Sequence, residues 1–111
     1  MRVLLVDDNP AYLLGCLIVL MHAGHQVVGC GSFEQARRYM DQGAFDVLIT
    51  DVRLGAYNGL QLVIRAPSTT MKIAMSAFGD PALRREAAQA GARFVEKPSD
   101  CTALAALLTP A

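Results

Sequence analysis

Residues 45–51 read Phe-Asp-Val-Leu-Ile-Thr-Asp, a short apolar run that ends on an acidic residue. An apolar run of this length, with glycines and polar residues after it, predicts a strand that is covered on both faces. Residues 2–8, Arg-Val-Leu-Leu-Val-Asp-Asp, repeat the arrangement. The chain therefore contains at least two buried strands, each with a carboxylate at its carboxyl end.

Helical and strand patterns alternate outward from these two runs. Strands are predicted at residues 2–6, 25–30, 45–50, 71–75 and 93–96, and helices at 10–23, 33–42, 60–64, 81–90 and 100–109. Asp8 or Asn9 before Pro10, Ser32, and Asp80 before Pro81 are typical helix starts. Residues 53–59 are expected to form a loop. Five strands alternating with five helices predict an α/β fold with a parallel sheet.

Length and composition limit the classes of function. The 111 residues predict a single domain, residues 1–111, and 53% are hydrophobic, which excludes a disordered chain. Ten basic and ten acidic residues cancel, and no Lys/Arg-dense segment exists, so direct nucleic-acid binding is not expected. The most apolar stretch, residues 11–23, is too short to span a bilayer, which predicts no membrane insertion. No signal-like segment begins the chain, so a cytoplasmic location is predicted.

Three cysteines are scattered along the sequence. Cys16, Cys30 and Cys101 are odd in number and lack the Cys-x-x-Cys spacing of many metal sites. We therefore expect small buried apolar residues, without a disulfide or a zinc site.

Polar side chains follow four of the five predicted strands. Asp7 and Asp8 follow the first, Asp51 the third, Ser76 the fourth and Lys97 the fifth. In an open parallel sheet, ligands bind beyond the carboxyl ends of the strands. Three carboxylates, a hydroxyl and an amine are therefore expected to meet at one edge.

Each carboxylate alone has a simpler explanation. Asp8 could be a helix cap and Asp51 a turn residue. Together they repel, because two charges 4 Å apart interact by about 1 kcal/mol in water and about 4 kcal/mol at an effective dielectric constant of 20. Mg²⁺ is the cofactor expected to offset this repulsion, since it prefers carboxylate and phosphate oxygens. Asp51 is the better nucleophile for a phosphoryl group, because Asp7 and Asp8 are adjacent and better placed to hold a metal.

These motifs, taken in order, resemble the receiver domains of bacterial two-component response regulators, over essentially the whole chain. The resemblance rests on residues 6–8 (Val-Asp-Asp), residues 45–51, Gly59 eight positions after Asp51, residues 76–77 (Ser-Ala) and residues 91–98 (Gly-Ala-Arg-Phe-Val-Glu-Lys-Pro). It implies a flavodoxin-like, doubly wound five-stranded sheet in the order 2-1-3-4-5, with five surrounding helices.

The resemblance also implies roles for the residues at the strand ends. Asp51 would be the phosphoacceptor, and Lys97 would bind the phosphoryl group. Mg²⁺ would be held by Asp8, Asp51 and the main-chain carbonyl of Arg53, with Asp7 acting largely through water. Outside substrates are not expected, so the domain would catalyse only its own phosphotransfer and dephosphorylation.

A switch and a set of partners are implied in the same way. Ser76 would turn toward the phosphoryl group and Phe94 would move inward, which changes the surface formed by the fourth helix, fifth strand and fifth helix. The Lys97–Pro98 bond resembles the cis peptide of the family. The donor would be a histidine kinase or a histidine phosphotransfer protein, and a homodimer is a further option.

Three features depart from the family pattern or leave alternatives open. Gly55 stands where the family usually has proline, which predicts a looser loop, and the short interval from Asp51 to Ser76 predicts a short third helix or exit loop. The first helix is apolar over more than one stripe, which fits either deep packing or a docking face.

Two other functions are compatible with parts of the pattern. A receiver-like interaction module that is not phosphorylated would keep the fold, although the intact set of acidic residues argues against it. An aspartyl-phosphate phosphatase would need an Asp-x-Asp pair on one loop, whereas Asp7 and Asp8 are adjacent.

Overall fold

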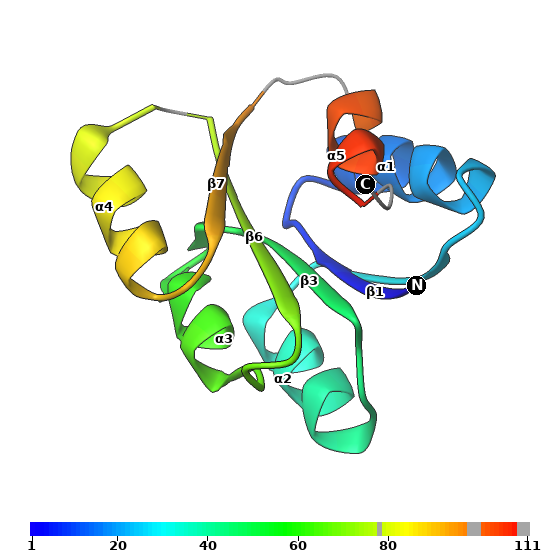
Figure 1. The fold of residues 1–111 in the computed structure, drawn as a ribbon, viewed down its shortest axis with the longest axis horizontal. Helices are drawn as coiled ribbons and strands as arrows, with labels where there is room; N and C mark the ends of the chain where they lie inside the picture. The colour runs from blue at the N-terminus through cyan, green and yellow to red at the C-terminus, as the bar shows by residue number, and fades with distance from the viewer. Residues whose placement is uncertain (78, 98–100, 109–111) are drawn as a thin grey trace.

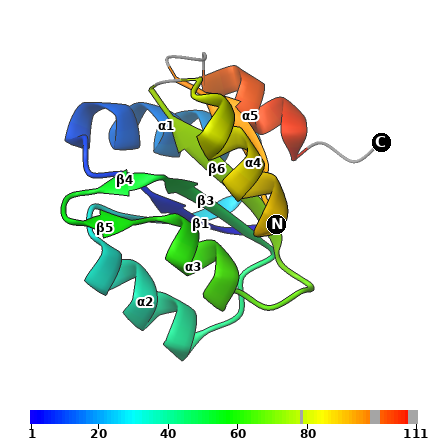
Figure 2. The ribbon, with the colours of Figure 1, turned by 90° about the vertical axis from the view of Figure 1, so that its left-hand side faces the viewer.

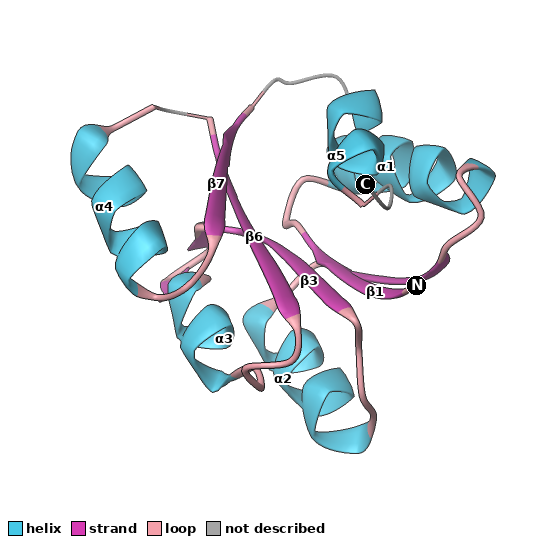
Figure 3. Cartoon of the chain, viewed as in Figure 1, coloured by secondary structure: helices cyan, strands magenta, loops and turns pink. Residues whose placement is uncertain are grey.

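Five parallel strands form the central sheet of the computed structural model, which describes residues 1–77, 79–97 and 101–108. Figures 1 and 3 show the sheet crossing the middle of the molecule. The strands are β1 (Arg2–Val6), β2 (Gln26–Cys30), β3 (Val47–Asp51), β6 (Met71–Ser76) and β7 (Arg93–Glu96). Their order is β2-β1-β3-β6-β7, and every neighbouring pair is parallel. Counted along the chain this order is 2-1-3-4-5, as predicted.

The helices lie on both faces of the sheet. They are α1 (Pro10–His22), α2 (Phe33–Gln42), α3 (Leu60–Arg65), α4 (Pro81–Gln89) and α5 (Cys101–Leu107). Figure 2 shows α1 and α5 on one face and α2 and α3 on the other. Residues of α4 pack into the same apolar cluster as those of α2 and α3. The predicted doubly wound α/β fold is confirmed.

Alternate side chains of each strand enter opposite layers of the core. Leu4 and Leu48 pack toward α2 and α3, whereas Leu5 and Ile49 pack toward α1 and α5. Successive side chains of a strand point to opposite faces, so a strand covered on both sides is apolar at every position. The continuous apolar runs in the sequence follow from this packing.

Capping residues begin three helices where the sequence predicts. Of the two candidates before Pro10, Asn9 is the cap, and its side chain accepts hydrogen bonds from the backbone N–H groups of Ala11 and Tyr12. Ser32 caps α2 and Asp80 caps α4 in the same way. Each cap satisfies backbone donors that the first helical turn leaves unpaired. Asp8 is therefore not used as a cap.

The predicted loop at residues 53–59 is wrong in detail. It contains a small antiparallel hairpin of β4 (Arg53–Leu54) and β5 (Tyr57–Asn58). The prediction of a short third helix is confirmed, because α3 spans six residues. The Lys97–Pro98 peptide and the two ends of the predicted helix 100–109 lie outside the described residues.

The outer face of α1 exposes large apolar side chains. Leu14, Ile18 and Met21 are 57%, 49% and 56% exposed, while Cys16 and Leu20 are fully buried. Deep packing on all sides is therefore wrong for this helix. Among the described residues, no helix combines the length and apolar character needed to cross a membrane.

The cysteines do not all behave as predicted. Cys16 of α1 and Cys101 of α5 form a disulfide, with their Cα atoms 5.1 Å apart. Sequence spacing could not reveal this pair, because 85 positions separate the two residues and only the packing of α1 against α5 brings them together. Cys30 is a free, buried thiol, as expected.

Candidate functional site

Asp7 and Asp8 leave β1 in different directions. Asp7 is 1% exposed, and its Oδ1 accepts a hydrogen bond from the Asn9 backbone N–H at 2.9 Å. Its own N–H donates to the Cys30 carbonyl at 3.1 Å, which continues the sheet one residue beyond β1. Asp8 is exposed, and its Oδ2 accepts from the Gly55 N–H at 3.3 Å. One carboxylate is thus fixed in the sheet edge, and the next faces solvent.

Asp51 is the last residue of β3 and is 8% exposed. Its Oδ1 accepts from the Arg53 N–H at 3.3 Å. Gly59 lies directly beside it: a Cβ built on Gly59 would lie 1.9 Å from the Asp51 carbonyl oxygen. Only a residue without a side chain fits there, so Gly59 permits the chain to return close to Asp51.

Lys97 follows β7 and joins two of the carboxylates. Its Nζ donates to Asp7 Oδ2 at 2.5 Å and to Asp51 Oδ2 at 3.2 Å. Its N–H donates to the Ser76 carbonyl at 2.6 Å, which ties the lysine backbone to the end of β6. Lys97 therefore places one positive charge between two buried negative charges.

Burial affects the pKa values of both Asp51 and Lys97. Burial raises the pKa of Asp51 above its ordinary value, and the charge and hydrogen bond of Lys97 lower it only in part. For Lys97, burial alone would lower the pKa, but the hydrogen bond to Asp7 and the charge of Asp51 outweigh burial and raise it. The lysine consequently stays protonated beside its carboxylates.

Three carboxylates approach closely enough to share a cation. Oxygen atoms of Asp7, Asp8 and Asp51, hereafter the carboxylate cluster, lie within 4.8 Å of one another. Lys97 offsets one of three negative charges. An all-oxygen set with one solvent-facing member fits a hard divalent cation that keeps part of its water shell. The cluster has the donor chemistry of such a site.

Ser76 and Phe94 lie on the two strands next to β3. Ser76 ends β6 and is 2% exposed. Phe94 of β7 is half-buried, and the guanidinium carbon of Arg84 lies 4.7 Å from the centre of its ring. Arg84 also forms an ion pair with Glu96 at 3.3 Å. The aromatic side chain is thus held between the core and a residue of α4.

Gly55 lies in the turn of the hairpin formed by residues 53–58. Gly55 has a φ of +60°, which proline cannot adopt, and its N–H donates to Asp8. The rings of Phe33 and Tyr57 stack with centroids 4.8 Å apart, which joins the hairpin to α2. The looser loop expected from Gly55 stays a prediction, and these contacts are the ones that would oppose it. Sequence reasoning missed the stack because the two aromatic residues are far apart in the chain.

Tyr12 is a further residue that sequence reasoning missed. It lies in the first turn of α1, and Lys97 Nζ is 4.4 Å from the centre of its ring. Burial raises the pKa of its hydroxyl, an effect that the charge of Lys97 partly offsets. Its place shortly after Asp7 and Asp8 was the available signal, because the start of α1 borders the same sheet edge.

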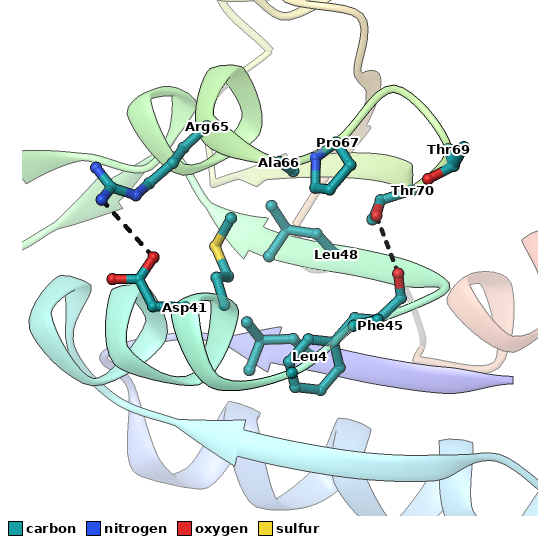
Figure 4. Close-up of a pocket in the computed structure, with 12 residues that line it drawn as sticks. Leu4, Asp41, Phe45, Leu48, Arg65, Ala66, Pro67, Thr69 and Thr70 are labelled. Carbon is teal, nitrogen blue, oxygen red and sulfur yellow. Dashed lines mark hydrogen bonds and ion pairs between the residues drawn. The ribbon is translucent and has the colours of Figure 1, made fainter.

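A cavity of about 180 Å³ lies at the opposite end of the sheet, between α2 and α3. Figure 4 shows it lined by Leu4, Phe45, Leu48 and Pro67, with the exposed ion pair of Arg65 and Asp41 (3.7 Å) at its side. Its lining is mainly apolar. The convergent charged groups lie instead at the carboxyl ends of the strands.

Comparison with known proteins agrees with this geometry. The model of the response regulator receiver domain matches residues 3–109. The alginate biosynthesis transcriptional regulatory protein AlgB of Pseudomonas syringae pv. tomato is 36% identical over 102 residues, which cover 87% of this chain and 22% of that protein. The chain thus spans about a fifth of that relative's length.

Solved structures of this class share the fold. The chemotaxis response regulator CheY4 of Vibrio cholerae superposes with a TM-score of 0.86 at 26% identity, covering 96% of this chain and 94% of that one. A response regulator from Burkholderia pseudomallei was solved with a phosphorylated aspartic acid and a calcium ion. It superposes with a TM-score of 0.88 at 21% identity, and the match covers 97% of this chain and 66% of that one. With the family model matching nearly every residue, the chain belongs to the response regulator receiver domain family.

Proposed function

We propose that Asp51 is the residue of this receiver domain that accepts the phosphoryl group. The contact that carries the proposal is the pair of hydrogen bonds from Lys97 Nζ to Asp7 and Asp51. It puts a fixed ammonium beside a carboxylate that also lies within reach of Asp8. Phosphoryl transfer depends mainly on such positioning and charge stabilisation.

The transfer would form one bond and break one. An oxygen of Asp51 attacks phosphorus, and the bond from phosphorus to the donor breaks; with a phosphohistidine donor, the leaving imidazole takes a proton from water. Lys97 would exchange its bond to Asp51 for one to a phosphoryl oxygen while keeping Asp7. Hydrolysis of the acyl phosphate by water would reverse the modification.

The carboxylate cluster would hold Mg²⁺. Asp8 and Asp51, with the main-chain carbonyl of Arg53, are the proposed direct ligands, and buried Asp7 would act through water. When bound, Mg²⁺ neutralises charge on the phosphoryl oxygens. The hydrogen bond from Gly55 to Asp8 would keep that side chain turned toward the hairpin.

Ser76 and Phe94 are the proposed switch. The Ser76 hydroxyl would donate to a phosphoryl oxygen, and Phe94 would then move inward. Arg84 contacts the Phe94 ring, so the movement would disturb the link between β7 and α4. Phosphorylation would thereby alter the surface of α4, β7 and α5. The donor of the phosphoryl group would be a histidine kinase or a histidine phosphotransfer protein.

Incubation with acetyl phosphate, with and without Mg²⁺, tests the assignment by intact mass. We expect one base-labile phosphate that requires Mg²⁺ and is absent from Asp51→Asn. Asp46→Asn is the matched control, because Asp46 is an exposed carboxylate just before the amino end of β3. It should be phosphorylated like the unaltered protein.

Two results would contradict the proposal. The absence of an adduct under every condition would favour an unphosphorylated interaction module. Rapid hydrolysis of unrelated phosphate esters would favour the phosphatase alternative.

A further inference from the structure

A disulfide joins the two helices on one face of the sheet. Figure 1 shows α1 and α5 side by side, and Cys16 and Cys101 connect them with a Cα separation of 5.1 Å. Cys16 belongs to the buried apolar cluster that also contains Leu104 and Leu108, and Cys101 packs against that cluster. The disulfide adds a covalent link to the packing of α5, whose Leu104 is fully buried in the same cluster.

The two cysteines differ in access. Cys16 is fully buried, whereas Cys101 is half-buried. Of the two residues, Cys101 is therefore the one that is accessible from solution. This is the arrangement of an attacking and a resolving cysteine.

Each cysteine follows, by four positions, one member of the contacting pair Tyr12 and Lys97. Tyr12 precedes Cys16 by four positions, which puts the two side chains on the same face of α1. Lys97 precedes Cys101 by four positions in the sequence. Tyr12 and Lys97 contact each other, with Nζ 4.4 Å from the ring centre. The disulfide therefore joins Cys101 to α1, the helix whose Tyr12 contacts Lys97.

We propose that Cys16 and Cys101 are a thiol–disulfide pair whose redox state adjusts the phosphoryl-binding site through Lys97. The inference rests on the proposed function, because it gives Lys97 a role toward the phosphoryl group. In the oxidised form, α5 is fixed to α1 and Lys97 is held over Tyr12, beside Asp7 and Asp51. In the reduced form this constraint is lost.

The oxidant is a low-molecular-weight disulfide. The Cys101 thiolate attacks one of its sulfurs, forms a mixed disulfide and releases a first thiolate. The Cys16 thiolate then attacks the Cys101 sulfur and releases the second. The pair loses two electrons, the small disulfide gains them, and the two protons of the cysteine thiols end on the two released thiols.

Oxidised glutathione and dithiothreitol prepare the two forms for the test. Alkylation with iodoacetamide after denaturation should modify only Cys30 in the oxidised protein and all three cysteines in the reduced protein. Beryllofluoride, a non-covalent mimic of the phosphoryl group, is then titrated with Mg²⁺ into each form by calorimetry. Both forms are kept below their unfolding transitions, as checked by circular dichroism.

We expect the oxidised form to bind beryllofluoride about threefold or more tightly, because its lysine is already positioned. Cys101→Ser should bind like the reduced form whatever the redox treatment. Cys30→Ala is the matched control, since its buried thiol belongs to the opposite core layer, and it should keep the full redox response.

Different results would contradict the redox role of the cysteines and the phosphoacceptor role of Asp51. Alkylation of all three cysteines after oxidation, or equal affinity of the two forms, would overturn the redox inference while leaving Asp51 as the acceptor. Loss of both beryllofluoride binding and acetyl phosphate labelling in either form would overturn both.

Discussion

Asp8 differs from the other members of the carboxylate cluster in its exposure. Asp7 is bonded to Lys97, Asp51 shares the same lysine, and both are buried. Asp8 instead faces solvent and accepts one backbone hydrogen bond from the hairpin. Its charge is therefore the one least compensated by the protein and most available to a cation.

Replacing Asp8 by Asn should weaken Mg²⁺ binding by about tenfold, since one ligand charge is lost. Asn keeps the shape of the Asp8 side chain and can accept the hydrogen bond from the Gly55 N–H, so the free energy of unfolding should change little. Isothermal titration with MgCl₂ measures the effect. Asp46→Asn removes an equal charge remote from the cluster, and an equal loss there would show that only net charge matters.

Glycines at two positions give opposite predictions for the same substitution. Gly59→Ala should lower the free energy of unfolding by about 2 kcal/mol or more, because the new Cβ would collide with the Asp51 carbonyl oxygen. Gly15 lies inside α1, and a Cβ there meets no atom within 4 Å. Gly15→Ala should raise the free energy of unfolding by about 0.5 to 1 kcal/mol through helix propensity.

Urea unfolding of both variants measures these changes. If Gly59→Ala were as stable as the unaltered protein, the close approach of Gly59 to the Asp51 carbonyl oxygen would be contradicted. The paired design separates a steric effect from the general effect of replacing glycine.

At the scale of elements, the hairpin of β4 and β5 has few contacts of its own. Two residues pair on each strand, and the Phe33–Tyr57 stack attaches the hairpin to α2. This segment supplies the Gly55 N–H to Asp8 and carries the Arg53 carbonyl that we propose as a metal ligand. We therefore expect the stack to support the proposed metal site by holding the hairpin in place.

Tyr57→Ala should weaken Mg²⁺ binding by about threefold to tenfold, because a stacked aromatic pair contributes about 0.5 to 1.5 kcal/mol beyond its buried area. Tyr57→Phe keeps the ring and should bind nearly normally. Titration calorimetry compares the three proteins. Normal binding by the alanine variant would mean that the hairpin is ordered without the stack.

At the scale of the whole molecule, the disulfide closes a long loop of chain. Cys16 and Cys101 are 85 positions apart, so the bond restricts most of the unfolded chain. Reduction should lower the free energy of unfolding by about 2 to 4 kcal/mol. Urea unfolding with and without dithiothreitol measures this, with Cys101→Ser as a permanently reduced reference. An unchanged midpoint in reductant would contradict the bond.

Most of the fold and the placement of its acidic residues could be predicted from local sequence. Buried strands are apolar at every position, and Asn9, Ser32 and Asp80 mark helix starts within a few residues. The strand ends then place Asp7, Asp8 and Asp51 at one edge. This placement can be predicted for any parallel sheet, because the carboxyl ends of all its strands lie at the same edge.

Contacts between residues far apart in the chain could not be predicted. Cys16 meets Cys101, Phe33 stacks on Tyr57, and Tyr12 supports Lys97. None of these pairs has a distinctive spacing, because their distance depends on how whole helices and loops pack.

The sequence alone determined the α/β alternation, the helix caps and the set of charged groups at the sheet edge. These features depend on interactions within a few residues and on the two periodicities of helix and strand. The tertiary structure alone decided that α1 keeps an exposed apolar face, that Gly55 sits in a hairpin where proline cannot, and that two cysteines join α1 to α5. Such contacts arise from packing across the whole chain, which no short stretch of sequence specifies.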